Sequence, residues 1–98
     1  MCGICGTTGQ NTQTTTRMLQ TILHRGPDDT GYFSDNGISL GHARLSIIDI
    51  DTGAQPMTYA NGRYVVVYNG EIYNHLSVRA SLQSRGHVLQ TNSDTEIL

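Results

Sequence analysis

The chain reads GYFSDNGISLGH at residues 31–42, and this stretch carries the clearest folding signal in the sequence. Asn36-Gly37 lies between two runs with strand character, and Asn-Gly accommodates the positive φ angles that a two-residue type I′ turn requires. The same dipeptide recurs at Asn61-Gly62, between Met57–Tyr59 and the largely apolar run 63–68. The two signals predict two antiparallel β-hairpins.

Two further runs favour strands. Residues 45–50 read LSIIDI, are rich in branched apolar side chains, and end at the turn-like Asp51-Thr52-Gly53. A shorter strand is predicted over residues 87–91. The longest apolar run, residues 64–68, is strand-sized and far too short to span a bilayer, so we expect no membrane segment.

The first of two predicted helices spans about Thr14 to His24. Its apolar face is expected to carry two pairs spaced four residues apart, Met18/Ile22 and Leu19/Leu23. Gly26-Pro27 should end this helix, because proline cannot continue the hydrogen-bond pattern of a helix interior.

The second helix is expected from about Asn74 to Ser84, with Gly86 as its C-terminal cap. Helical spacing places Ile72, Leu76, Ala80 and Gln83 along one side of it. Residues 93–96, SDTE, match a capping box in which Ser93 and Glu96 satisfy each other's backbone N–H groups. Because the sequence stops within that turn, and one turn is not stable alone, we expect a fragment truncated inside a larger domain.

Composition excludes several classes of function. The 98 residues carry 14% charged side chains and a net charge of −2, without a basic run or acidic tail, which argues against nucleic acid and membrane surfaces as partners. The N-terminus lacks the basic segment and the apolar core that mark a secretory signal. The two cysteines, Cys2 and Cys5, are too close in sequence for a disulfide scaffold. This cysteine content fits a protein of the reducing cytoplasm best.

Cys2 is a candidate nucleophile because it would become the N-terminal residue if Met1 were removed. Its free α-amine, with a pKa of about 7.7–8.0, could then act as a base beside its own thiol. A cysteine at this position is more often incidental. Residues 2–5 also have the C-x-x-C spacing of a redox dithiol or half a zinc site, but no second cysteine pair accompanies them.

Polar residues at predicted strand ends supply further candidates. Arg44 could bind a carboxylate through its planar guanidinium or could be a solvated edge charge. Asn69 and Gly70 could form an oxyanion hole from a side-chain amide and a backbone N–H, or only a turn. Asp94 is explained by helix capping without any ligand. The turn at residues 25–28 could be only a helix stop.

The order of these signals is more specific than any one of them. Six motifs follow one another: MCGI at 1–4, HRGPD at 24–28, GHARLSIID at 41–49, GAQPM at 53–57, NGEIYN at 69–74 and SDTE at 93–96. This order resembles the class II glutamine amidotransferase domain, in the form found at the front of glutamine-dependent asparagine synthetases. The resemblance covers essentially the whole chain but only about half of that domain.

The resemblance implies an α+β fold of the N-terminal-nucleophile type, a four-layer α/β/β/α sandwich with about its first half present. Cys2 would attack the side-chain amide carbon of glutamine, forming a thioester and releasing ammonia. Asn69 and Gly70 would hold the tetrahedral oxyanion. The remaining glutamine-binding roles would be shared, with Arg44 on the α-carboxylate, Glu71 and Asp94 on the α-ammonium, and the backbone of Leu45, Ser46, Ile47 and Ile48 shaping one side of the pocket.

In such proteins a second domain uses ATP and Mg²⁺ to activate aspartate, and ammonia from glutamine converts it to asparagine. We expect no cofactor site in residues 1–98, because the glycine-rich pyrophosphate motif of that domain is absent from them. Half a sandwich would leave apolar faces uncovered, which predicts contact with the synthetase domain or a homo-oligomer. The alternatives are a non-catalytic remnant acting as an assembly module, and a Cys2/Cys5 redox or metal site.

Overall fold

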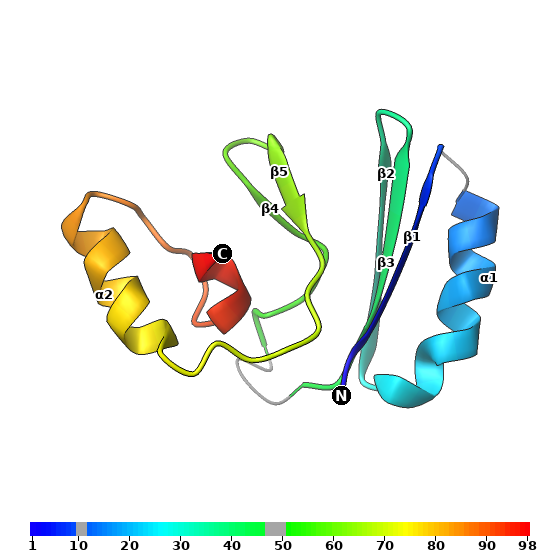
Figure 1. Cartoon of the computed structure of the whole chain (residues 1–98), viewed down its shortest axis with the longest axis horizontal. Coiled ribbons are helices and arrows are strands. Elements are labelled where there is room, and N and C mark those ends of the chain that lie inside the picture. Colours follow the sequence, from blue (N-terminus) through cyan, green and yellow to red (C-terminus); the bar gives the residue numbers. More distant parts are fainter. Residues whose placement is uncertain (10–11, 47–50) are drawn as a thin grey trace.

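The computed structural model describes residues 1–9, 12–46 and 51–98. Along the longest of its 42 × 28 × 18 Å dimensions lie, in order, helix α1, a three-stranded sheet, a two-stranded hairpin and helix α2 (Figure 1). The expected mixture of helices with antiparallel sheets is confirmed.

The three-stranded sheet has the order β1-β3-β2, with both pairings antiparallel. Its strands are β1 (Gly3–Thr8), β2 (Asp29–Asp35) and β3 (Ile38–Arg44). Asn36 and Gly37 connect β2 to β3 with φ angles of 49° and 78°, and Asp35 pairs with Ile38 directly beyond them. The first predicted hairpin is therefore confirmed, with positive φ at both turn residues as a type I′ turn requires.

The second hairpin joins β4 (Met57–Tyr59) to β5 (Tyr64–Val66). Asn61 and Gly62 have φ angles of 56° and 82°, and the Arg63 N–H donates to the Ala60 carbonyl at 3.1 Å, so this prediction is also confirmed. Strand β5 is shorter than the apolar run 64–68 suggested. The ladder ends at the Met57–Val66 pair, directly after Pro56.

Helix α1 (Thr12–Ile22) covers one face of the three-stranded sheet and continues into a 3₁₀ turn, η1 (Leu23–Arg25), that ends before Gly26-Pro27 as predicted. Thr15 and Leu19 are buried against the sheet. The prediction for Leu23 was wrong, because its side chain is 39% exposed. A 3₁₀ turn advances by three residues instead of 3.6, which rotates Leu23 off the inward stripe.

Helix α2 (His75–Ser84) matches the predicted range, and Gly86 caps it with a φ of 90°. The Gly86 N–H donates to Gln83 and the His87 N–H to Leu82, the paired bonds of a Schellman motif. The side of α2 that carries Leu76, Ala80 and Gln83 does not face the rest of the molecule, although Ile72 before the helix is half-buried. Leu76 is 70% exposed, Ala80 and Gln83 are also exposed, and the half-buried residues are His75, Val78, Arg79 and Leu82.

Arg79 gives the physical reason for that difference. Its guanidinium donates to the carbonyls of Thr91 at 2.8 Å and Ser93 at 2.9 Å, which turns this side of α2 toward the C-terminal segment. Charge-assisted bonds of this kind outweigh the modest apolar pattern of the helix. Within the described ranges, no helix is both long and apolar enough to cross a membrane.

The C-terminal segment forms η2 (Asp94–Ile97), a 3₁₀ turn. Ser93 is its N-cap and accepts from the Thr95 N–H at 3.2 Å, as half of the capping box predicts. The other half was wrong, because the Glu96 carboxylate accepts instead from the N–H groups of Gln90 and Thr91 at 2.6 and 2.7 Å. These bonds also explain why residues 87–91 are not the predicted strand.

The strand predicted over residues 45–50 was wrong at its start, because the chain leaves the sheet after Arg44. The Leu45 N–H donates to the sulfur of Cys2 at 3.3 Å and so has no role in a ladder. Residues 47–50 lie outside the described residues.

Candidate active site

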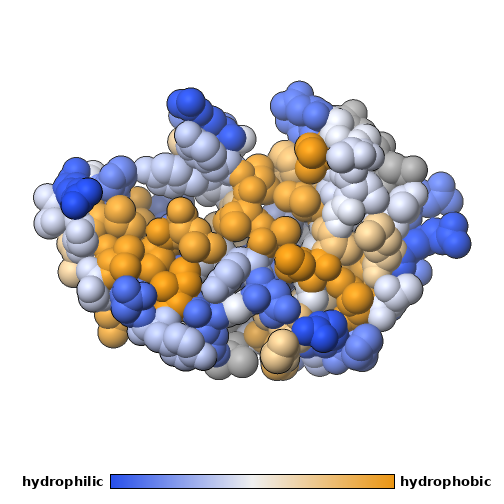
Figure 2. All heavy atoms as spheres, viewed as in Figure 1, coloured by the Kyte–Doolittle hydropathy of each residue, from blue (hydrophilic) through white to orange (hydrophobic). Residues whose placement is uncertain are grey.

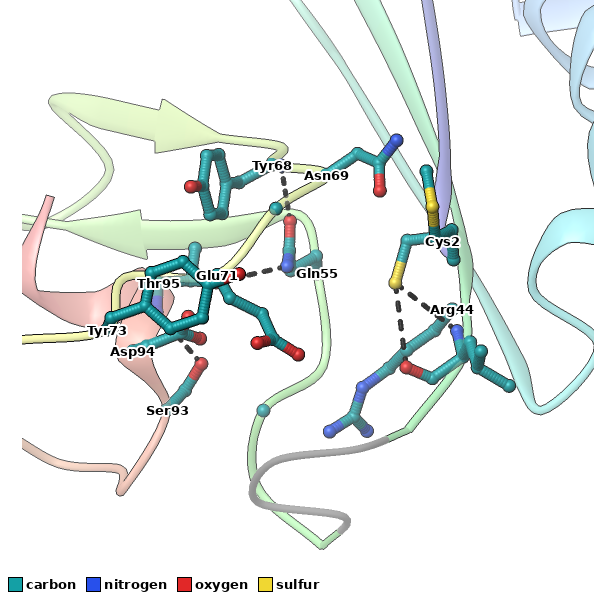
Figure 3. A pocket seen from close by; sticks show the side chains of 14 residues that line it. Cys2, Arg44, Gln55, Tyr68, Asn69, Glu71, Tyr73, Ser93, Asp94 and Thr95 are labelled. Carbon is teal, nitrogen blue, oxygen red and sulfur yellow. Dashed lines mark hydrogen bonds between the residues drawn. The ribbon is translucent and has the colours of Figure 1, made fainter. Parts of the chain in front are cut away.

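A cavity of about 360 Å³ lies beside the end of the three-stranded sheet where β1 begins and β3 ends. Its other side is formed by the segment that follows β5 and the segment that precedes η2 (Figure 3). Its size is within the range of pockets for small molecules. The described residues that line it are Met1, Cys2, Arg44, Leu45, Gly53, Gln55, Tyr68, Asn69, Gly70, Glu71, Tyr73, Ser93, Asp94 and Thr95. Residues far apart in sequence thus meet around one space.

Cys2 lies immediately before β1, and the backbone of Leu45 and the side chain of Arg25 fix its position. Its sulfur accepts from the Leu45 N–H at 3.3 Å and lies 3.6 Å from the Leu45 carbonyl oxygen. Arg25 donates through Nε to the Cys2 carbonyl at 3.1 Å. Asp28 accepts from the Ser46 N–H at 2.8 Å. The turn at residues 25–28 therefore does more than stop a helix, because it braces both Cys2 and the segment after β3.

Cys5 lies in a different environment from Cys2. Its sulfur is 3.8 Å from the Thr15 carbonyl of α1, and the strand register places Cys5 opposite Gly41. Desolvation by burial raises the pKa of the Cys5 thiol, which disfavours the reactive thiolate. The two sulfurs contact different segments, and among described residues no group of three His, Cys, Asp or Glu side chains could hold a metal. This geometry disfavours a Cys2/Cys5 dithiol.

Asn69 and Gly70 follow β5 on the side of the cavity opposite Cys2. Figure 3 shows the Asn69 side chain extending from the end of the hairpin into the space between the two segments. Two side chains hold the preceding residue, Tyr68. Gln55 Oε1 accepts from the Tyr68 N–H at 2.6 Å, and His42 Nε2 lies 3.3 Å from the Tyr68 carbonyl oxygen.

His42 must be the donor in that contact, because a carbonyl oxygen only accepts. The imidazole is fully buried on β3. Desolvation by burial is the main cause that lowers the pKa of His42, and the nearby positive charge of Arg44 acts in the same direction. The bond to Tyr68 and the negative charge of Asp29 act the other way. The ring is thus neutral near pH 7, with its hydrogen on Nε2.

Charged groups of opposite sign line the same cavity. Arg44 ends β3 and is 6% exposed, with its guanidinium directed toward the wall that carries Glu71 (Figure 3). Asp94 is also 6% exposed, and its Oδ2 accepts from the Ile72 N–H at 2.9 Å. A cationic fork facing carboxylates suits a small molecule that carries both a carboxylate and an ammonium group.

Of the described residues singled out from the sequence as site residues, Ser46 does not line this cavity. Ser46 lines a neighbouring depression together with Asp28, Asp29 and Arg44. Ile47 and Ile48 lie outside the described residues. Conversely, Gln55, Tyr73 and Thr95 line the cavity without having been singled out as site residues. Each lies within a quoted motif, but a motif does not tell which of its residues the fold turns inward.

The whole chain, residues 1–98, matches the model of the glutamine amidotransferase domain family. The chain belongs to this family. Among its curated relatives, "Asparagine synthetase [glutamine-hydrolyzing] 1" of Bacillus subtilis (strain 168) is 42% identical across all of this chain. "Asparagine synthetase B [glutamine-hydrolyzing]" of Escherichia coli (strain K12) is 49% identical over 79% of it.

A plant relative, the glutamine-hydrolyzing asparagine synthetase of Brassica oleracea, is 36% identical across the whole chain. The relatives are much longer than the amidotransferase sequence described here. The chain spans 17% of the Bacillus subtilis protein, 14% of the Escherichia coli protein and 17% of the Brassica oleracea protein. It therefore corresponds to less than a fifth of each of them.

Proposed function

We propose that this chain hydrolyses glutamine through Cys2. The Cys2 sulfur attacks the side-chain amide carbon, the C–N bond breaks, and the nitrogen leaves as ammonia after gaining a proton. Water then cleaves the thioester and glutamate leaves. The observation that carries this proposal is that Cys2, Asn69, the cationic Arg44 and the carboxylates of Glu71 and Asp94 line one cavity.

The geometry suggests one orientation for the substrate. Arg44 would bind the α-carboxylate, and Glu71 with Asp94 would receive the α-ammonium. Asn69 and the backbone N–H of Gly70 would stabilise the oxyanion that forms when the sulfur attacks. Leu45, whose N–H points at the sulfur, would keep Cys2 aimed into the cavity. The backbone of residues 45–48 would shape that side of the pocket.

Removal of Met1 is part of the proposal, because the α-amine of Cys2 is then free to take the proton of its own thiol. Met1 is 73% exposed at the mouth of the cavity. Its removal would therefore open the cavity without disturbing packed residues.

For the fold, we propose the N-terminal-nucleophile α/β/β/α sandwich, which is supported by the order of helix, sheet, hairpin and helix in Figure 1. For the complete protein, we propose that the ammonia serves ATP-dependent synthesis of asparagine from aspartate in the cytoplasm. The names of the relatives support this assignment. ATP and Mg²⁺ would act in the part of those relatives that this chain does not span.

The test is mass spectrometry of the protein before and after treatment with a glutamine-like chloroketone. We expect loss of Met1 and a single adduct on Cys2 that excess glutamine prevents. Cys5→Ser is the matched control and should be labelled like the unmodified protein, whereas Cys2→Ser should not be labelled. Retention of Met1, or labelling of Cys2 and Cys5 alike without protection by glutamine, would contradict the proposal.

A further inference from the structure

Gln55 occupies an unusual position relative to β5. The pairs Met57–Val66, Thr58–Val65 and Tyr59–Tyr64 set the register of the hairpin, and extending it by two residues places Gln55 opposite Tyr68. The ladder ends at the Met57–Val66 pair and does not reach these two residues. The Gln55 main-chain carbonyl is packed against Gly31 of β2, where even a Cβ atom would come within 1.9 Å of its oxygen.

Beyond the end of the ladder, the side chain of Gln55 binds the backbone of Tyr68. Its Oε1 accepts from the Tyr68 N–H at 2.6 Å, while His42 donates to the Tyr68 carbonyl. Both polar backbone groups of Tyr68 are therefore bonded to side chains from other segments. A buried backbone group without a partner is costly, so these bonds hold the residue that directly precedes Asn69.

The other end of the same amide reaches the C-terminal segment. Gln55 Nε2 donates to Thr95 Oγ1 at 3.2 Å, and Thr95 is only 3% exposed (Figure 3). Thr95 directly follows Asp94, whose carboxylate binds the Ile72 N–H two residues after Gly70. One side chain thus connects the Asn69 segment to the Asp94 segment. An amide suits this place because it is both donor and acceptor.

We infer that Gln55 is a positioning residue that couples the oxyanion-binding segment to the segment that recognises the α-ammonium group. This inference rests on the proposed glutamine hydrolysis. Gln55 needs no direct contact with the reacting atoms for this role. Through its bond to Tyr68, Gln55 sets the distance of Asn69 from Cys2. The bond to Thr95 anchors the Gln55 side chain.

The decisive variant is Gln55→Met in the complete encoded protein, because methionine has similar length and no group that can bond to Tyr68 or Thr95. We expect kcat for glutamine hydrolysis to fall roughly 10- to 100-fold, since misplacing a catalytic group by about 1 Å has effects of this size. Labelling of Cys2 by the glutamine-like chloroketone should slow by a similar factor. Alkylation of Cys2 by iodoacetamide, which develops no oxyanion, should remain within about two-fold.

Gln83→Met is the matched control, because Gln83 is exposed on α2 far from these bonds in the sequence and outside the cavity lining. It should leave all three rates unchanged.

A second pair of variants tests whether Thr95 anchors the Gln55 side chain. Thr95→Val removes the acceptor and should lower kcat about 3- to 10-fold, whereas Thr95→Ser keeps the hydroxyl and should restore it.

The inference is overturned if Gln55→Met keeps the chloroketone and glutamine rates of the unmodified protein, or if iodoacetamide alkylation falls to the same extent. If Gln55→Met does not fold, the Thr95 pair decides, and equal rates for valine and serine overturn the coupling. Failure of the proposed function has a different signature, because the unmodified protein itself would then show no glutamine-protected labelling of Cys2.

Discussion

Asn69 and Arg44 line one cavity but would act at different stages of the proposed reaction. An oxyanion exists only after the Cys2 sulfur has attacked, whereas the α-carboxylate is present from the moment that glutamine binds. Groups that act in the transition state affect kcat, and groups that bind substrate and transition state equally affect KM. Substitutions at these two positions should therefore separate the two constants.

Asn69→Ala removes the side-chain amide that would donate to the oxyanion. We expect kcat for glutamine hydrolysis to fall about 10²- to 10³-fold, with KM within a few-fold, because the lost donor acts mainly in the transition state. Steady-state measurement of glutamate release checks this. A change confined to KM would remove Asn69 from the oxyanion role.

Arg44→Lys keeps the positive charge but loses the planar fork that binds a carboxylate through two parallel bonds. We expect KM for glutamine to rise roughly 10- to 100-fold, the equivalent of one charge-assisted hydrogen bond, with a smaller change in kcat. The same assay measures both constants. An unchanged KM would place the substrate α-carboxylate elsewhere.

The approach of β2 to the Gln55 segment depends on a single glycine. A Cβ atom at Gly31 would lie 1.9 Å from the Gln55 carbonyl oxygen and 2.8 Å from Pro56 Cδ, so Gly31→Ala must push these elements apart. We expect a loss of stability of about 1–3 kcal/mol, visible as a lower midpoint of thermal unfolding by circular dichroism.

Gly37→Asn is the matched control for that substitution. Gly37 has a φ of 78° and nothing within 4 Å of a built Cβ, and asparagine tolerates this backbone conformation. The midpoint of thermal unfolding of Gly37→Asn should stay close to that of the unmodified protein. Equal shifts for Gly31→Ala and Gly37→Asn would show that close approach of β2 to residue 55 is not what stabilises the fold.

Local chemistry decided which helix and hairpin boundaries could be predicted. Asn36-Gly37, Asn61-Gly62 and Gly86 adopt the positive φ angles that their residue types favour, so these turns and the helix cap were predictable. Which side of α2 faces the molecule could not be predicted, because Arg79 bonds to carbonyls 12 and 14 residues away. Residues 87–91 failed as a strand for a similar reason, since their N–H groups are partly satisfied by Glu96.

The stability of the whole molecule should depend on pH through His42. Because burial lowers the pKa of His42 below its usual value of 6.5, the unfolded chain binds more protons than the folded one below that pH. Stability should therefore be constant above about pH 6.5 and fall as the pH is lowered below it, by at most about 1.4 kcal/mol per pH unit.

Thermal unfolding of the unmodified protein and His42→Gln between pH 7.5 and 5.5, compared by circular dichroism, checks this dependence. The glutamine variant should lose most of the pH dependence in this window. Glu96 does not interfere, because although burial opposes its ionisation, hydrogen bonds from Thr91 and Gln90 outweigh that effect and lower its pKa from 4.5. Identical pH dependence in both proteins would exclude His42 as the titrating group.

The surface of the molecule bears on its partners. Figure 2 shows apolar side chains gathered over α2 and the neighbouring C-terminal segment. Leu76, Val88 and Leu98, which belong to these segments, are 70%, 80% and 68% exposed. Exposed apolar surface of this kind promotes association. The expectation that another domain or a second copy contacts this chain stays a prediction.

The sequence by itself determined the elements whose structure depends on neighbouring residues. Local backbone preferences and sequence pattern were enough to predict the two Asn-Gly turns, the capped second helix and the N-cap at Ser93. They were also enough to recognise the order of the six motifs. The sequence also named Cys2, Arg44, Asn69, Gly70 and Asp94 as candidates, and the resemblance to the amidotransferase family added Glu71. It did not determine that they share one cavity, since their separation in the chain conceals their distance in space.

Only the tertiary structure decided how those residues are held. The Leu45 N–H against the Cys2 sulfur, Arg25 on the Cys2 carbonyl, and Gln55 between Tyr68 and Thr95 are hydrogen bonds across 13 to 43 residues. Such bonds hold the chain where the strands have ended, before Met57, after Val66 and after Arg44. Because they form only when the layers pack together, no local pattern announces them.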